Sequence, residues 1–143
     1  MSIDGQYDPN NIFAKIVRGE MASAKVWEDD KTFVFMDVFP QAKGHTLVIS
    51  KTSQARNLLE AEPATLTELI ATVQKTARAI RTALKPDGII VTQFNGAPAG
   101  QTIYHLHFHL IPRWEGQVLA RHGGGMADRG ELNALAEAIR AAL

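Results

Sequence analysis

The 143-residue sequence contains no cysteine, which excludes disulfide bonds and thiolate metal sites. It also lacks an excess of charge of either sign, because 15 Lys and Arg residues balance 15 Asp and Glu residues. A protein that binds nucleic acid or an acidic membrane through a whole face is usually strongly basic. We therefore expect no nucleic-acid or membrane partner, and any anionic ligand has to be held by local groups.

Long apolar runs are missing as well. The longest span four or five residues, whereas a transmembrane helix needs about 20. The first ten residues (MSIDGQYDPN) show no signal-peptide pattern. We expect a cytoplasmic protein with residues 1–9 as a frayed tail and residues 10–143 as a single domain.

The spacing of apolar residues predicts an α+β fold. Between Pro63 and Lys85 apolar residues recur with the helical period, which indicates one long amphipathic helix. Two shorter helices are expected, one capped by Asn10 and the other over residues 131–142. Five strands are predicted over residues 24–28, 32–36, 45–50, 89–94 and 102–111. Because strands and helices do not alternate regularly, we expect a five-stranded, mostly antiparallel sheet.

Three of the five histidines, His105, His107 and His109, lie close together in the last predicted strand. Alternate side chains of a strand share a face, so we expect the three imidazoles on one face, with successive Cα atoms about 6.6 Å apart. The opposite face of this strand is expected to carry Tyr104, Leu106, Phe108 and Leu110.

Three interpretations of this histidine row are open. It can be a polar row that faces solvent, a role that Ser, Thr, Lys or Glu would fill equally well. It can be a metal site, because His-x-His on a strand presents two ligands, although the nearest carboxylates in sequence are Glu115 and Asp87. It can also act on phosphorus, because a neutral imidazole with a pKa near about 6.5 is a good nucleophile.

The loop before the histidines favours chemistry at phosphorus. Residues 95–102 (NGAPAGQT) combine small residues, which allow close backbone approach, with the amide of Gln101 and the hydroxyl of Thr102. A loop of this kind alone is a common turn. Joined directly to the histidine row, it supplies donors for phosphate oxygens.

Residues 105–111 (HLHFHLI) resemble the signature of the histidine triad proteins, His-x-His-x-His followed by two apolar residues. The resemblance extends to residues 12–16, 35–38, 40–42 and 45–49, and it is strongest to the Hint-like and bacterial branch. It implies a homodimeric enzyme that cleaves a nucleoside monophosphate from a leaving group, of the phosphoramidate or dinucleoside polyphosphate type. The intermediate would be a nucleotidyl-histidine adduct, and no cofactor is expected.

The resemblance also implies roles for the matching residues. His107 would attack the α-phosphorus, His109 would contact the phosphate, and His105 would orient His107. Gln101 and Thr102 would contact the phosphate and the leaving group, and Asn95 and Gly100 would line the same pocket. The expected purine nucleotide would be held by Asp37 at its ribose, by the nearby His45, and by an apolar clamp on the base made of Ile12, Phe13, Phe35 and Val38.

These residues also have ordinary structural interpretations. The apolar residues of the clamp fit a hydrophobic core. Asp37 precedes a turn, where Asp is a common hydrogen-bond acceptor, and His45 can simply begin a strand. His122, beside a Gly-rich stretch, matches no motif and is expected to be an ordinary loop residue.

Two departures from the family pattern limit these implications. Zinc-bearing relatives have Cys where this sequence has Asn11 and Ala14, so we expect no metal. Residues 117–129 do not match the Trp-containing C-terminal segment of the Hint branch, which leaves the leaving group open. The alternatives are a nucleotide-binding regulatory module with little turnover and a metal-dependent hydrolase that uses histidine pairs.

Overall fold

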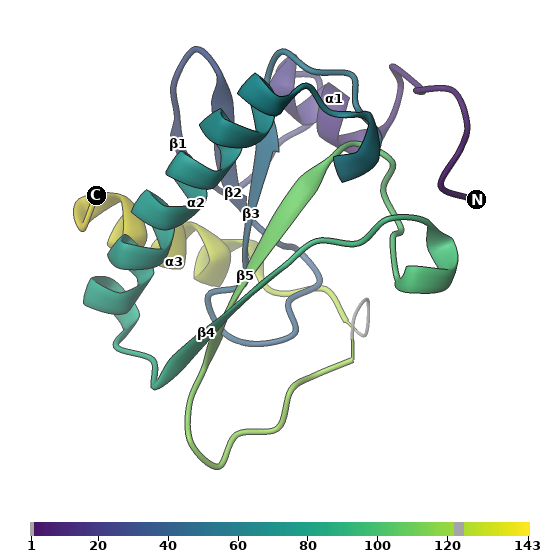
Figure 1. The fold of residues 1–143 in the computed structure, drawn as a ribbon. Coiled ribbons are helices and arrows are strands. Elements are labelled where there is room, and N and C mark those ends of the chain that lie inside the picture. Colours follow the sequence, from purple (N-terminus) through teal and green to yellow (C-terminus); the bar gives the residue numbers. More distant parts are fainter. Residues whose placement is uncertain (1, 122–124) are drawn as a thin grey trace.

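The computed structural model describes residues 2–121 and 125–143, so His122 lies outside the described residues. A five-stranded sheet of order β1-β2-β3-β5-β4 is flanked by three α-helices, and each neighbouring pair of strands is antiparallel (Figure 1). The predicted α+β fold with one long and two shorter helices is confirmed. The elements are α1 (Ile12–Val17), β1 (Lys25–Glu28), β2 (Thr32–Met36), β3 (Thr46–Ser50), α2 (Pro63–Leu84), β4 (Gly88–Thr92), β5 (His107–Arg113), α3 (Arg129–Ala141) and the short 3-10 helices η1 (Leu58–Glu60) and η2 (Ala97–Ala99).

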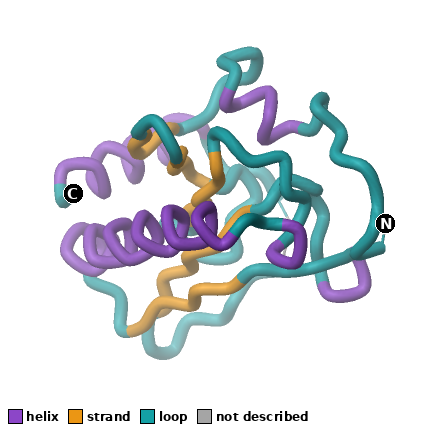
Figure 2. The backbone as a smooth tube through the Cα atoms, turned by 45° about the horizontal axis from the view of Figure 1, so that its top comes forward, coloured by secondary structure: helices purple, strands orange, loops and turns teal. Residues whose placement is uncertain are grey.

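One face of the sheet carries the larger hydrophobic core. Val34, Val48 and Leu110, from three neighbouring strands, are fully buried there. They pack against α2 and α3, which lie side by side (Figure 2). Helix α2 adds Leu69 and Ile80 from its apolar stripe. Burial of each such side chain contributes about 1.5–3 kcal/mol, so this face fixes the sheet on which the site is built.

The opposite face of the sheet holds a smaller core under α1. Phe13 of α1 packs there with Leu47 and Ile49 of β3. In the register of β3 and β5, Leu47 lies opposite His109 and Ile49 opposite His107. Because side chains alternate along a strand, both histidines lie on the α1 face.

Strand β5 begins later than the sequence predicts. The predicted strand covered residues 102–111, whereas residues 101–106 are irregular. The backbone N–H of Leu106 donates to the carbonyl of Ala55 (3.0 Å) instead of to a neighbouring strand. The expectation of three imidazoles on one strand face is therefore wrong for His105, which precedes the strand.

Helix starts differ slightly from the sequence prediction. Asn11, not Asn10, caps α1, and its side chain accepts from the N–H of Ala14 (2.9 Å). Asp128 caps α3 by accepting from the N–H of Glu131 (3.0 Å). Both caps satisfy N–H groups that a helix leaves without internal partners.

The N-terminal segment lies against the domain. The carbonyl of Ile3 accepts from Nη1 of Arg56 (2.9 Å) and from Nδ2 of Asn57 (3.0 Å). The hydroxyl of Tyr7 lies 2.8 Å from Nδ1 of His105. These contacts bring part of the segment over residues 1–9 to the predicted site.

Among the described helices, none combines the length and the apolar character needed to cross a membrane.

Candidate active site

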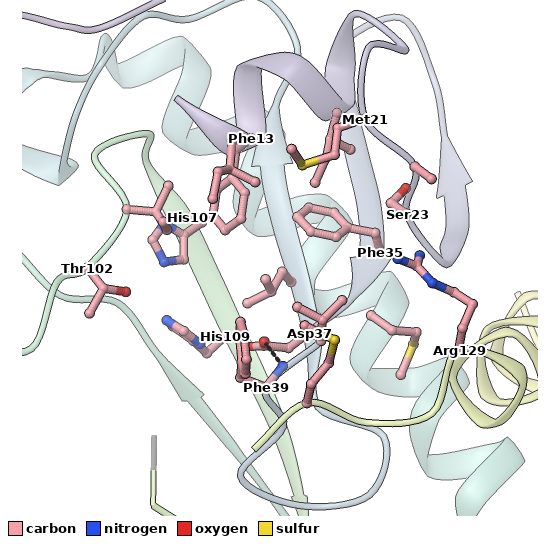
Figure 3. A pocket seen from close by; sticks show the side chains of 18 residues that line it. Phe13, Met21, Ser23, Phe35, Asp37, Phe39, Thr102, His107, His109 and Arg129 are labelled. Carbon is pink, nitrogen blue, oxygen red and sulfur yellow. Dashed lines mark hydrogen bonds between the residues drawn. The ribbon is translucent and has the colours of Figure 1, made fainter. Parts of the chain in front are cut away.

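A pocket of about 520 Å³ opens on the α1 face of the sheet (Figure 3). Its walls come from α1, from the end of β2 and the turn after it, from β5 and from the start of α3. The structure gathers here eight of the residues that the sequence singled out: Ile12, Phe13, Phe35, Asp37, Val38, Thr102, His107 and His109. Two histidines, a carboxylate and an apolar wall thus share one cavity, of a size typical for small-molecule sites.

His107 is held in one tautomer. Its Nδ1 atom lies 2.7 Å from the backbone oxygen of His105, and a carbonyl can only accept, so Nδ1 carries the proton. The rings of His107 and Phe13 pack edge to face, with centroids 4.9 Å apart and an interplanar angle of 88°. When the ring is neutral, the lone pair that nucleophilic attack needs is therefore on Nε2.

His105 lines a second, smaller pocket of about 170 Å³, together with Tyr7. Its Nε2 atom lies 3.0 Å from the carbonyl of Ser50 and donates to it, so Nδ1 accepts from the hydroxyl of Tyr7. Burial lowers the pKa of His105 below the ordinary value of 6.5, and the hydrogen bond to Ser50 opposes this shift. His105 is thus a neutral ring bonded at both nitrogens.

His45 and His109 form a buried hydrogen-bonded pair. The N–H of Gln41 donates to Nδ1 of His45 (3.0 Å), so the proton of the neutral ring is on Nε2. That Nε2 atom lies 2.9 Å from Nδ1 of His109 and 3.4 Å from Oδ2 of Asp37. His45 therefore donates to His109, which places the proton of a neutral His109 on its own Nε2 atom.

Asp37, His45 and His109 also offer donor atoms that lie within 4.8 Å of one another, close enough to surround a metal ion. A metal-ligating histidine usually donates the N–H of its other ring nitrogen to an acceptor. In His45 the other nitrogen instead accepts from Gln41, so a metal on Nε2 would require an imidazolate. The donor set suits a hydrogen-bond chain better than a metal site.

Asp37 makes the hydrogen bond of an ordinary turn and also lines the pocket. Its Oδ1 atom accepts from the N–H of Phe39 (2.8 Å), as in a common Asp turn. The side chain nevertheless lines the pocket beside Phe35 (Figure 3). The turn fixes one carboxylate oxygen and leaves Oδ2 near His45.

Gln101 is turned into the loop and does not line the pocket. Its amide nitrogen donates to the carbonyls of Arg56 (2.7 Å) and Ile103 (3.1 Å), and its oxygen accepts from the N–H of Gly96 (2.8 Å). These bonds shape the loop before β5. Thr102 is the loop residue of the predicted set that reaches the pocket.

Four other predicted residues also lie outside the pocket lining. Asn95 accepts from the N–H of Leu58 (3.0 Å) and thereby ties the loop to η1. Gly100 has a φ of 108°, a conformation that favours glycine. His45 and His105 are not among the lining residues but are hydrogen-bonded to His109 and His107, which are.

Sequence reasoning assigned no site role to ten other pocket residues, some of which lie beside predicted ones and some in other parts of the chain. These are Ile16, Met21, Ala22, Ser23, Met36, Phe39, Leu47, Ile103, Met126 and Arg129. The last two are placed by a hydrogen bond from the N–H of Ala127 to the carbonyl of Val38 (2.9 Å). A local sequence pattern cannot predict the contact between Ala127 and Val38, because the two residues are far apart in the sequence.

Comparison with known proteins gives a consistent result. A family profile described as HIT domain matches residues 18–116. A crystal structure of a HIT-like protein from Bartonella henselae superposes with a TM-score of 0.92 at 51% identity, over 97% of this chain and 100% of that one. A zinc-bound histidine triad family protein from Mycobacterium smegmatis gives a TM-score of 0.80 at 34% identity, over 92% and 94%.

A curated relative carries a named activity. Adenylylsulfatase HINT3 from Arabidopsis thaliana is 36% identical over 117 residues, which cover 78% of this chain and 59% of that protein. Because the HIT domain match spans most of the sequence and includes all three histidines of the 105–109 segment, the chain belongs to the histidine triad (HIT) family.

Proposed function

We propose that the protein cleaves a nucleoside monophosphate from a leaving group, through a covalent nucleotidyl adduct on His107. The observation that carries this proposal is the hydrogen bond between Nδ1 of His107 and the backbone oxygen of His105 (2.7 Å). It places the lone pair on Nε2 of a residue that lines the pocket.

The pocket suggests how the nucleotide is seated. The α-phosphorus has to lie within reach of Nε2 of His107. The ribose hydroxyls are near the carboxylate of Asp37, and the base lies against Phe13 and Phe35, which also line the cavity. The phosphate is thus at the polar end of an otherwise largely apolar pocket.

Local donors stabilise the charge that develops on phosphorus. Nε2–H of His109, fixed by the bond from His45, donates to a phosphate oxygen, and the hydroxyl of Thr102 is a second donor in the pocket. Such preorganised donors need no overall basic charge, in keeping with a chain of zero formal net charge.

The reaction then has two balanced steps. Nε2 of His107 forms a bond to phosphorus as the bond to the leaving group breaks, and the leaving group departs with that electron pair and takes a proton from water. In the second step water adds to phosphorus, the P–Nε2 bond breaks, and His107 regains its lone pair while a proton returns to solvent.

The bond cleaved is of the phosphoramidate or phosphoanhydride class. The relative named adenylylsulfatase supports a leaving group attached to an adenylyl phosphorus. A panel of purified nucleoside phosphoramidates, dinucleoside polyphosphates and adenylyl sulfate, assayed for nucleoside monophosphate release, tests this proposal. Turnover by the wild type that His107→Ala abolishes is expected, and wild-type turnover by His107→Ala would refute the assignment.

The alternative function is a nucleotide-binding module with little turnover. It keeps the same pocket and the same three histidines, so binding alone does not separate the two functions. Nucleoside monophosphate binding without release of product from any substrate of the panel would favour this alternative.

We further propose a homodimer joined along β4. This strand is at the edge of the sheet, and its sequence GIIVT has neither the proline nor the charge that commonly blocks edge pairing. Val91 of β4 and Ile70 of α2 are exposed to 46% and 52%. Light scattering is expected to give a dimer mass for the wild type and a monomer mass for Val91→Lys, and a wild-type monomer would contradict the proposal.

A further inference from the structure

His105 is bonded at both of its ring nitrogens. Its Nε2 atom donates to the carbonyl of Ser50 (3.0 Å), and its Nδ1 atom accepts from the hydroxyl of Tyr7 (2.8 Å). The Tyr7 and His105 rings lie with centroids 5.7 Å apart. The side chain of His105 is thus held between β3 and the N-terminal segment.

These side-chain bonds matter because no strand ladder holds His105. The residue lies in the irregular segment 101–106, before β5 begins. Its backbone carbonyl is nevertheless the acceptor that fixes the tautomer of His107. The peptide unit of that carbonyl is also held by its N–H group, that of Leu106, which donates to the carbonyl of Ala55 (3.0 Å). The placement of residue 105 itself depends on the side-chain bonds to Ser50 and Tyr7.

The N-terminal segment is itself anchored at both ends. On one side the carbonyl of Ile3 accepts from Arg56, a fully buried side chain, and from Asn57. On the other side Nδ2 of Asn11, the cap of α1, donates to the carbonyl of Asp8 (2.8 Å). Tyr7 therefore reaches His105 from a segment with a defined path.

We propose that Tyr7 is a positioning residue of the active site, which holds His105 so that its carbonyl keeps Nε2 of His107 ready for attack. The inference rests on the proposed function, and it means that the N-terminal segment contributes a side chain, Tyr7, to the site. Tyr7 touches no reacting atom in this account and acts through His105.

Replacing Tyr7 by Phe tests this role, because it removes the hydroxyl and keeps the ring. We expect kcat to fall about tenfold with KM within about twofold of the wild type, since orientation of the nucleophile is lost but the pocket is kept. Ser2→Ala is the matched control, because its hydroxyl bonds only within the same segment, to Asp4, among the described residues. An unchanged kcat, or an effect on KM alone, would overturn the proposal.

A second measurement does not depend on turnover. In the proton NMR spectrum the Nδ1 proton of His107, bonded to the carbonyl of His105, is expected to shift upfield in Tyr7→Phe as that bond weakens, and to stay in place in Ser2→Ala. If the wild type cleaves no substrate, the proposed function fails, and this resonance still decides the role of Tyr7. An unmoved resonance would contradict the role even in an active enzyme.

A separate observation concerns the far end of the pocket. In Figure 3, His107 and Thr102 lie at one end, and Arg129 lies at the other, with Phe35 and Asp37 between them. The phosphorus has to be at His107, so Arg129 is at the end that the base occupies in the proposed seating.

Arg129 is placed for contact with a ligand. Its backbone position is fixed by the bond from Ala127 to Val38 (2.9 Å) and by the cap of α3 at Asp128. Its guanidinium extends toward Phe35 (Figure 3). Within residues 2–121 and 125–143 its side chain has no hydrogen-bond or ion-pair partner, which is also true of Arg78, Arg81 and Arg121, but of these four arginines only Arg129 lines the pocket.

We infer that Arg129 selects guanine over adenine, again on the basis of the proposed function. Guanine presents two acceptors, O6 and N7, which a guanidinium can contact together, while adenine presents an amino donor in place of O6. A guanidinium at the edge of the base therefore favours the base with two acceptors.

Paired substrates test the selection. With guanosine and adenosine phosphoramidates we expect the wild type to favour guanosine in kcat/KM by about tenfold, and Arg129→Gln to reduce this ratio to about twofold. Arg78→Gln, an exposed arginine on α2, is the control. An equal loss for both substrates, or no preference in the wild type, would overturn the inference. If neither substrate turns over, the proposed function fails, and the relative affinities for GMP and AMP still test the selection.

Discussion

The Nδ1 atom of His107 lies 2.7 Å from the backbone oxygen of His105. This contact decides which ring nitrogen of His107 has the lone pair, because a carbonyl oxygen can only accept a hydrogen bond. A second fixed bond, from Nε2 of His45 to Nδ1 of His109 (2.9 Å), places the proton of His109 on Nε2. The protein thus presents one acceptor nitrogen and one donor nitrogen from alternate residues of β5, His107 and His109, which share a face of the sheet.

Breaking the second bond is expected to slow the chemical step. His45→Leu removes the N–H that donates to Nδ1 of His109, so the proton of His109 is no longer fixed on Nε2. We expect kcat to fall by about tenfold or more with a smaller change in KM. Steady-state kinetics measure this, with thermal unfolding to confirm that the variant is folded. A variant with wild-type kcat would exclude this role of His45.

Asp37 is expected to recognise the ribose. Asp37→Asn keeps an oxygen for the N–H of Phe39 but loses the charge that strengthens hydrogen bonds from ribose hydroxyls. We expect KM for a ribonucleoside substrate to rise about tenfold, with little change for its 2′,3′-dideoxy analogue. Equal effects on both substrates would show that Asp37 acts on the fold and not on the sugar.

The buried, neutral His105 makes stability depend on pH. Folding lowers its pKa below 6.5, so below that pH the unfolded chain binds a proton that the folded protein resists. Stability is therefore lost as the pH falls through about 6.5 and is retained above it. In urea unfolding at about pH 7.5 and about pH 5.5, we expect a smaller pH-dependent loss in His105→Asn than in the wild type. Equal losses in the two proteins would argue against a lowered pKa.

Metal removal is expected to leave activity unchanged. The Nδ1 atom of His45 accepts from Gln41, which makes the Asp37, His45 and His109 group a poor metal ligand set. Assays before and after treatment with EDTA, combined with elemental analysis, measure this. Loss of activity together with one bound metal per chain would support the metal-dependent alternative.

Much of the fold follows from local sequence patterns. The 3.6-residue period over Pro63–Lys85 predicts a helix that ends within one residue of α2, and the predicted strand 32–36 agrees with β2 at both ends. Both segments have strong periodicity and clear breaks. The predicted start of β5, at residue 102, was wrong. The residues just before the observed strand bond elsewhere: His105 to Ser50 and Tyr7, and Leu106 to Ala55.

The candidate site also contains residues that sequence motifs predict and residues that only the fold brings there. Residues within the recognised motifs, such as His107, Asp37 and Phe35, meet in one pocket. Tyr7 and Arg129 come from segments that match no motif, and they reach the site through contacts between distant parts of the chain. Composition and periodicity do not encode such contacts.

The most direct test of this account is the detection of the nucleotidyl-His107 adduct. The enzyme is mixed with an adenosine or guanosine phosphoramidate and quenched in alkaline denaturant, in which phosphohistidine bonds persist, and its intact mass and peptide masses are measured. The account predicts one added nucleoside monophosphate group per chain, on the peptide that contains His107, and none in His107→Ala. Substrate turnover without this adduct, or an adduct on another residue, would contradict it.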